Sequence, residues 1–132
     1  MDPLRFLTRK DASCSDLLSC LYDMKSIEIE VFYSLVDRKE ATLDQVAAAV
    51  HRDRSTVHRC LSKLVIAGLV YKQSRTRREG GYFHVYSPVE PARIREQARL
   101  RVEEISQSLR RLVDDFESDF RIHLGGASRS GR

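Results

Sequence analysis

Basic, hydroxyl and imidazole side chains are concentrated in residues 51–81 of this 132-residue chain. Eight cations and two anions give this segment a charge of +6, whereas the whole chain carries +4, so the other residues sum to −2. Guanidinium and ammonium groups bind phosphate, and all these side chains can hydrogen-bond base edges. Basic charge confined to one segment is typical of a nucleic-acid-binding surface, because phosphate contacts release condensed counterions. A solvated cationic surface is the alternative.

Some of these side chains fall on a predicted helix over residues 54–67. Val57, Leu61 and Leu64 recur at helical spacing and must face a core, so the opposite face displays polar side chains. The first two turns are dense in hydroxyls and arginines, where the helix dipole also favours an anion. An ordinary amphipathic surface helix is the alternative. We predict DNA contacts at two places in the sequence. Those in or just before this helix are Arg52, Arg54, Ser55, Thr56, His58, Arg59 and Lys63, and those after it are Lys72, Arg75, Arg77 and Arg78.

The neighbouring sequence predicts the elements that hold this helix. Thr42 and Gln45 form a capping box at the start of a preceding helix, and Asp53 is the predicted N-cap of the 54–67 helix. Gly68 is predicted to end that helix at the C′ position. The buried face of the preceding helix is predicted to consist of Leu43, Val46, Ala47 and Val50.

A hairpin is predicted after Gly68. A strand begins at Leu69, residues 82–87 form its β-rich return, and two glycines at 80–81 permit the turn. This places Arg75, Arg77 and Arg78 at the hairpin tip, where a basic loop can reach the minor groove or adjacent phosphates. The order of capped helix, turn, basic helix, glycine stop and basic hairpin is typical of a winged helix-turn-helix.

Two further helices are predicted nearer the N-terminus. Asp16 is the predicted N-cap of a short helix that runs through Met24. A second helix begins at Ser26 and extends to about Asp37. Its apolar stripe, at helical spacing, consists of Ile27, Val31, Phe32 and Leu35.

A long helix is predicted over residues 91–124, after the prolines that follow the hairpin. Its apolar residues are spaced 4, 3, 4, 3 and 4 apart, which indicates a coiled-coil seam made of Ala98, Val102, Ile105, Leu109, Leu112 and Phe116. So narrow an apolar stripe needs a partner to cover it, and we expect a helix from a second copy of the chain. The alternative is that the helix folds back on its own domain. Phe120 and Leu124 could do so even in a dimer. Residues 90–101 carry four cations and two anions, whereas residues 103–119 carry two cations and six anions.

The remaining composition argues against several other classes. The three cysteines lack the short spacing of zinc sites, and no phosphate-binding glycine loop or nucleophile–base motif is present, so we expect neither a metal or other cofactor nor an enzyme. No apolar stretch approaches the ~20 residues that span a bilayer, and the charged N-terminal residues do not form a signal peptide. We therefore expect a cytoplasmic protein.

At this point the chain resembles a known family. Residues 24–36, 41–50, 54–64 and 68–72, in this order, look like the N-terminal winged helix of the TrmB-type archaeal transcriptional regulators, and less closely like the broader MarR and ArsR-like class. The resemblance implies that Arg54, Ser55, Thr56, His58 and Arg59 stand at base- and phosphate-reading positions, with Arg77 and Arg78 in the wing. It also implies a dimerisation helix. Family members often continue into a sugar-binding domain, which this sequence does not match, so no effector is inferred.

The combined interpretation is a mainly α-helical protein with a small β-hairpin. Residues 1–87 form a winged helix-turn-helix, 88–124 a coiled-coil dimerisation helix and 125–132 a flexible tail. The predicted function is that of a homodimeric, sequence-specific regulator of transcription that binds double-stranded DNA. The alternative is a winged-helix protein-interaction module that does not read bases. Val65 and Ile66 replace charged residues of the family pattern, so we expect the long helix, its dimer mate or another protein to cover them.

Overall fold

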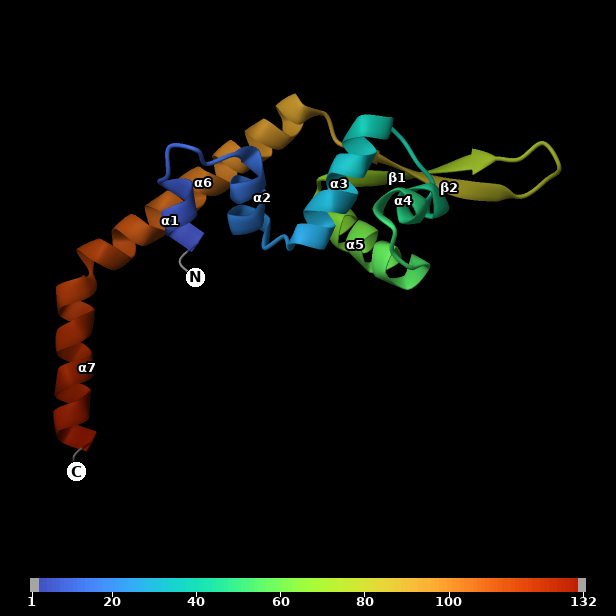
Figure 1. Ribbon diagram of the computed structural model, residues 1–132. Helices are drawn as coiled ribbons and strands as arrows, with labels where there is room; N and C mark the ends of the chain where they lie inside the picture. The colour runs from blue at the N-terminus through green and yellow to red at the C-terminus, as the bar shows by residue number, and fades with distance from the viewer. Residues whose placement is uncertain (1–2, 131–132) are drawn as a thin grey trace. The chain divides into compact units, whose positions relative to one another are not determined.

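The computed structural model describes residues 3–130 and is mainly helical, with one two-stranded antiparallel hairpin. It forms two compact units, one ending at Arg95 and the other beginning at Glu96. The elements follow in the order α1 (Pro3–Leu7), α2 (Cys14–Tyr22), α3 (Ser26–Arg38), α4 (Leu43–Val50), α5 (Arg54–Ile66), β1 (Val70–Thr76), β2 (Tyr82–Pro88), α6 (Pro91–Asp114) and α7 (Phe116–Ser130) (Figure 1).

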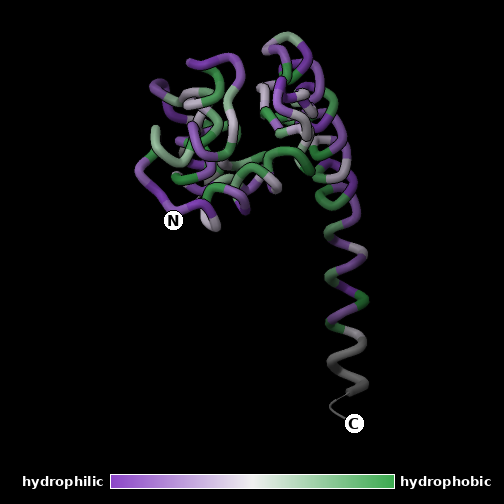
Figure 2. Tube along the Cα trace, turned by 90° about the vertical axis from the view of Figure 1, so that its right-hand side faces the viewer, coloured by the Kyte–Doolittle hydropathy of each residue, from purple (hydrophilic) through white to green (hydrophobic). Residues whose placement is uncertain are grey.

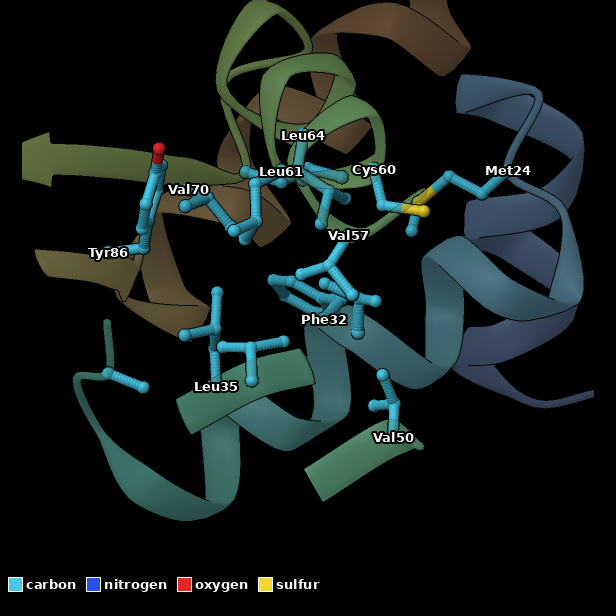
Figure 3. Close-up of a cluster of buried hydrophobic side chains, with 14 of the residues drawn as sticks. Met24, Phe32, Leu35, Val50, Val57, Cys60, Leu61, Leu64, Val70 and Tyr86 are labelled. Carbon is cyan, nitrogen blue, oxygen red and sulfur yellow. The ribbon is translucent and has the colours of Figure 1, made fainter. Parts of the chain in front are cut away.

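The core of the first unit lies where α3, α4, α5 and the hairpin meet. Figure 3 shows side chains of α5, among them Val57 and Leu61, pointing toward Phe32 and Leu35 of α3. The fully buried side chains of this core are Val31, Leu35, Val46, Val57, Leu61, Leu64 and Leu69. Burying one such side chain contributes about 1.5–3 kcal/mol. The predicted inward faces of α3, α4 and α5 are therefore confirmed.

A capping box begins α4, and the turn between α4 and α5 has a cap on each side. Thr42 and Gln45 form the predicted capping box, in which the Gln45 N–H donates to Thr42 Oγ1 at 3.2 Å and the Thr42 N–H donates to Gln45 Oε1 at 2.9 Å. His51 ends α4 in the left-handed region, at φ 56°. Asp53 then caps α5 by accepting from the Thr56 N–H at 3.2 Å, as predicted. Short loops capped on both sides fix the angle between the two helices.

Gly68 ends α5 as predicted. Its φ of 80° is a conformation that favours glycine, and the N–H groups of Gly68 and Leu69 donate to the carbonyls of Val65 and Leu64, both at 3.0 Å. This is a Schellman motif, which satisfies the last carbonyls of the helix. Leu69, directly after it, is fully buried and carries the chain into β1.

The hairpin pairs β1 with β2 from Val70↔Pro88 to Thr76↔Tyr82. Ala41 forms an isolated antiparallel bridge beside β2, because its N–H donates to the Tyr86 carbonyl at 3.0 Å and its carbonyl accepts from the Tyr86 N–H at 2.8 Å. The loop is residues 77–81, in which both glycines have positive φ. The structure corrects one prediction: Arg75 lies within β1, opposite Phe83, and not at the hairpin tip. The first strand is longer than predicted, because Ser74, Arg75 and Thr76 pair with His84, Phe83 and Tyr82 of the second.

The N-terminal helices differ from prediction in their limits. A short α1 was not predicted, and α2 begins at Cys14 instead of after Asp16. Asp16 stabilises that start from inside the first turn, since its carboxylate accepts from the Ser13 N–H at 2.9 Å. Asp23 then adopts a left-handed conformation, at φ 53°, so α2 ends before Met24. Met24 is nevertheless buried.

The predicted single helix over residues 91–124 is wrong, because it is divided at Asp115 into α6 and α7. No proline or glycine lies at the break. Four acidic residues cluster at 114–119, where they disfavour the end of one helix and favour the start of the next through the helix dipole. The Asp115 carbonyl accepts from the Asp119 N–H and the Ser118 hydroxyl, at 2.9 and 3.0 Å, and so opens α7. Apolar residues recur between polar ones along the C-terminal helical segment (Figure 2).

The predicted flexible tail from residue 125 also differs from the structure, in which α7 continues to Ser130; residues 131 and 132 lie outside the described range. Once a helix has formed, each further residue adds a hydrogen bond, which lets it extend through the two glycines. Within residues 3–130, no helix is both long and apolar enough to cross a membrane.

Candidate nucleic-acid interface

The first two turns of α5 carry five of the eleven residues predicted to contact DNA. Ser55, His58 and Arg59 are exposed along it, and Arg54 stands at its first position. Their exposure follows from the burial of Val57, Leu61 and Leu64 on the other side of the same helix. Arg52 is exposed in the turn before α5. The helix therefore presents hydrogen-bonding groups in its first two turns.

Thr56 has a structural role as well as a predicted DNA contact. Its hydroxyl donates to Asp53 Oδ1 at 2.6 Å, in addition to the backbone hydrogen bond that caps the helix. These hydrogen bonds, first that of the hydroxyl, lower the pKa of the Asp53 carboxyl, so the cap stays ionised at neutral pH. Arg59 Nη2 donates to Thr56 Oγ1 at 3.5 Å, a weak hydrogen bond at the edge of the accepted range.

A groove runs between the α4–α5 helices and the hairpin. Its residues, from both sides, are Thr42, Leu43, Asp44, Arg54, His58, Lys72, Arg77, Phe83, His84 and Tyr86. A more open depression that shares residues with it is formed by Leu43, Arg54, Ser55, His58 and Arg59. Four of the predicted residues, Arg54, His58, Lys72 and Arg77, are thus brought to one concave surface.

Aromatic rings position two of the hairpin cations. The Arg77 guanidinium lies 5.0 Å from the centre of the Phe83 ring, and the Lys72 ammonium lies 5.9 Å from that of Tyr86. Such cation–π contacts favour one side-chain orientation while leaving the charge available. Sequence reasoning missed Phe83, His84 and Tyr86. The strand register could have identified Tyr86, which lies directly opposite Lys72.

Two arginines of the predicted set form ion pairs within the domain. Arg54 Nη1 pairs with the carboxylate of Asp44 on α4, another groove residue that sequence reasoning missed. Arg75 Nη2 pairs with Glu40 Oε1 at 2.8 Å. All four side chains are well exposed, and exposed pairs of this kind contribute at most about 1 kcal/mol. A phosphate can therefore compete with either carboxylate. Arg78 is exposed in the hairpin loop.

Lys63 is placed differently from the rest of the set. Its ammonium donates to Glu28 Oε1 at 2.9 Å and to the Asp23 carbonyl at 2.6 Å, and it thereby ties α5 to the α2–α3 junction. The Glu28 side chain is only 13% exposed. Burial opposes its ionisation, but hydrogen bonds from the Lys25 N–H and from Lys63 outweigh this and hold the Glu28 pKa below its usual value. The geometry therefore favours a structural role for Lys63.

The cysteines and acidic residues give no sign of a second kind of site. Cys14 is exposed, Cys20 is half-buried, and Cys60 is buried in the core, where burial raises the pKa of its thiol. Cys14 Sγ lies 3.1 Å from the Tyr33 hydroxyl. Among residues 3–130, no three histidine, cysteine or acidic side chains are grouped so that they could hold a metal ion.

Comparison with known proteins identifies relatives. The family model described as "Sugar-specific transcriptional regulator TrmB" matches residues 18–92. The uncharacterized protein MJ1082 of Methanocaldococcus jannaschii is 29% identical over 107 residues, which cover 81% of this chain and 79% of that protein. A possible transcriptional regulator from Methanosarcina mazei Go1 has a similar structure, with a TM-score of 0.71 at 18% identity over 83% of this chain and 95% of that one.

TrmBL2, described as an archaeal chromatin protein with a novel mode of DNA binding, is also similar in structure. Its TM-score is 0.60 at 18% identity, over 91% of this chain and 41% of the TrmBL2 chain. At this level of identity, the two structural likenesses establish a shared fold.

The ion pair of Lys63 leads to a prediction about stability. Lys63→Ala should lower the free energy of unfolding by about 1–3 kcal/mol, because it leaves the mostly buried Glu28 carboxylate without its main cationic partner. Since the pKa of Glu28 is lowered by folding, its contribution is present at neutral pH and is lost as the pH falls through the lowered pKa. Urea unfolding between pH 3 and 7 should therefore show a smaller acid-dependent loss for Glu28→Gln than for the wild type.

Arg59→Ala is the matched control, because Arg59 is on the exposed face of the same helix. It should leave the urea midpoint within about 0.5 kcal/mol of the wild type. Equal stability of Lys63→Ala and Arg59→Ala would contradict a structural role for Lys63.

Proposed function

This chain belongs to the TrmB family of transcriptional regulators, and from that premise we propose that it binds double-stranded DNA as a homodimer and reads its sequence with α5. The observation that carries the proposal is the exposed polar face of α5 beside a groove lined by Arg54, His58, Lys72 and Arg77. A helix of this kind fits the major groove, and the hairpin of a winged helix lies along the neighbouring backbone. The DNA binding described for TrmBL2 is consistent with this use of the fold.

The proposed interface divides into two functional parts. Ser55, Thr56, His58 and Arg59 read base edges, and Arg52 and Arg54 at the start of α5 bind phosphate. Lys72, Arg77 and Arg78 hold the flanking backbone or minor groove. Arg75 joins them only if phosphate displaces Glu40. Lys63 is left out because of its contacts with Glu28 and Asp23.

The proposed dimer rests on the apolar stripe of α6. Of the six seam residues, Ala98 is buried in the single chain, whereas Val102, Ile105, Leu109, Leu112 and Phe116 are 41–62% exposed. A row of large apolar side chains left in water is unfavourable, and a second copy of the same helix would cover it. Two linked winged domains would then bind two half-sites separated by about one helical turn or a multiple of it. The proposal includes no sugar effector.

Salt dependence tests whether the basic surface meets DNA. If four to six cations per protomer reach phosphate, a dimer neutralises on the order of ten charges, and log K should fall with log[salt] with a slope near −9. Fluorescence anisotropy with a labelled duplex, measured from about 50 to 200 mM salt, gives this slope. A slope close to zero would favour the alternative of a protein-interaction module.

Two sets of variants distinguish contacts to base edges from contacts to the DNA backbone. Arg59→Ala should cost about 1–3 kcal/mol on a selected site and much less on random duplex, because it removes a contact to base edges. Arg77→Ala combined with Arg78→Ala should weaken both by similar factors, because phosphate contacts carry no sequence information. If instead the hairpin pair changes sequence preference and Arg59→Ala does not, the two roles are reversed.

The dimer has its own test. Leu109→Asp would place a carboxylate in the apolar seam at a cost of several kcal/mol, and sedimentation should show a monomer at concentrations where the wild type is a dimer. Loss of the linked second domain should reduce affinity for a two-fold site by ~10²–10⁴. Circular dichroism should still show cooperative unfolding, because the winged unit has its own core. Wild-type protein that sediments as a monomer would disprove the dimer.

A further inference from the structure

The exposed stripe of α6 has a spacing that fits a second copy in either direction, so the charges beside it must decide between the two. Val102, Ile105, Leu109 and Leu112 are separated by 3, 4 and 3 residues, a pattern that reads the same in both directions. We infer that the second copy lies antiparallel on α6, so that Val102 packs against Leu112 of that copy and Ile105 against its Leu109. This inference rests on the proposed homodimer and adds its direction and register.

The same register extends beyond these four residues. It sets Phe116, the largest seam residue, opposite Ala98, the smallest, whereas a parallel pair would set Ala98 opposite Ala98 and Phe116 opposite Phe116. Ala98 is already buried in the single chain, so the pairing of Ala98 with Phe116 agrees with the register but does not define it. The register is defined by the four central residues.

Charges beside the seam favour the same direction. Arg101, Ser108 and Asp115 directly precede the seam residues Val102, Leu109 and Phe116. In an antiparallel pair, residues at this position of the two helices face one another. Arg101 of each copy then faces Asp115 of the other, and Ser108 faces Ser108 on the two-fold axis. In a parallel pair, Arg101 would face Ser106, and no opposite charges would meet. Residues beside the seam are those that set helix orientation in coiled coils.

The overall charge of the helix supports this choice. Residues 90–101 carry a net +2 and residues 103–119 a net −4, so an antiparallel pair places the basic end of each copy beside the acidic end of the other. A parallel pair would place like charges side by side along the whole seam. Arg99 forms ion pairs within its own helix, with Glu96 at 2.6 Å and Glu103 at 2.8 Å.

The break after α6 lies within this register. The four central seam residues lie on α6, which ends at Asp114, whereas Asp115 lies at the break and Phe116 begins α7. In the antiparallel register, the two Arg95 positions lie about 36 Å apart along the pair, at 1.5 Å per residue. A parallel pair would place the two Arg95 positions side by side.

Disulfide trapping distinguishes the two directions. In a background with Cys14→Ser and Cys20→Ser, which removes the cysteines that are not buried, Ser108→Cys should cross-link readily on mild oxidation because it meets its own copy on the axis. Gln107→Cys is the matched control, since it lies on the side of the helix away from the seam. We expect at least a fivefold higher cross-linked fraction for Ser108→Cys on a non-reducing gel. Equal fractions, or stronger cross-linking of Leu109→Cys, which meets itself only in a parallel pair, would overturn the inference.

A charge exchange provides an independent measurement. Arg101→Glu should weaken dimerisation about tenfold, and Asp115→Arg should do so similarly, because each sets like charges opposite one another twice per dimer. The double variant should return to within about threefold of the wild type in sedimentation equilibrium. Failure of the double variant to recover would overturn the antiparallel register while leaving the homodimer in place. A monomeric wild type would overturn both, and DNA binding by α5 is measured separately by the Arg59 variant.

Discussion

The burial of one side of α5 is the constraint on which the rest of the structure depends. Val57, Leu61 and Leu64 are completely buried among α3, α4 and the hairpin. A helix is a rigid cylinder, so fixing these three side chains also fixes which residues face outward. Ser55, His58 and Arg59 are therefore displayed as a consequence of core packing, and no separate interaction is needed to orient them. The same core supplies stability to the domain and direction to its candidate interface.

The caps and ion pairs around α5 then set its ends and its angle. Asp53 caps the N-terminal end of α5, the Thr42–Gln45 box begins α4, and the Schellman motif at Gly68 turns the chain into β1. Lys63, bound to Glu28 and to the Asp23 carbonyl, holds the side of the helix nearest α3. The basic residues of α5 are therefore of two kinds. Lys63 forms contacts within the domain, whereas Arg54 and Arg59 are exposed at the surface.

Sequence reasoning succeeded where the determining interactions are local. Helix periodicity predicted the buried faces, and the caps at Thr42, Asp53 and Gly68 depend on residues within five positions of one another. It failed where distant residues decide. The ion pair of Lys63 with Glu28, which lies 35 positions away, was not predicted, and Arg75 was placed at the hairpin tip because the length of the ladder depends on both strands. Phe83 was missed for the same reason, since its contact with Arg77 requires the register. The break at Asp115 was missed because the apolar spacing continues through it.

The two amphipathic helices of the chain lead to opposite conclusions from the same periodicity. On α5 the apolar stripe is covered by the domain itself, and the polar face is what remains for a ligand. On α6 the apolar residues from Val102 to Leu112 remain exposed. Periodicity alone cannot distinguish these cases, because it defines a face without saying what covers it. Burial distinguishes them: the polar face of α5 is suited to DNA, and the apolar face of α6 is suited to another helix. In the proposed dimer, the distribution of charge along α6 then favours an antiparallel partner helix.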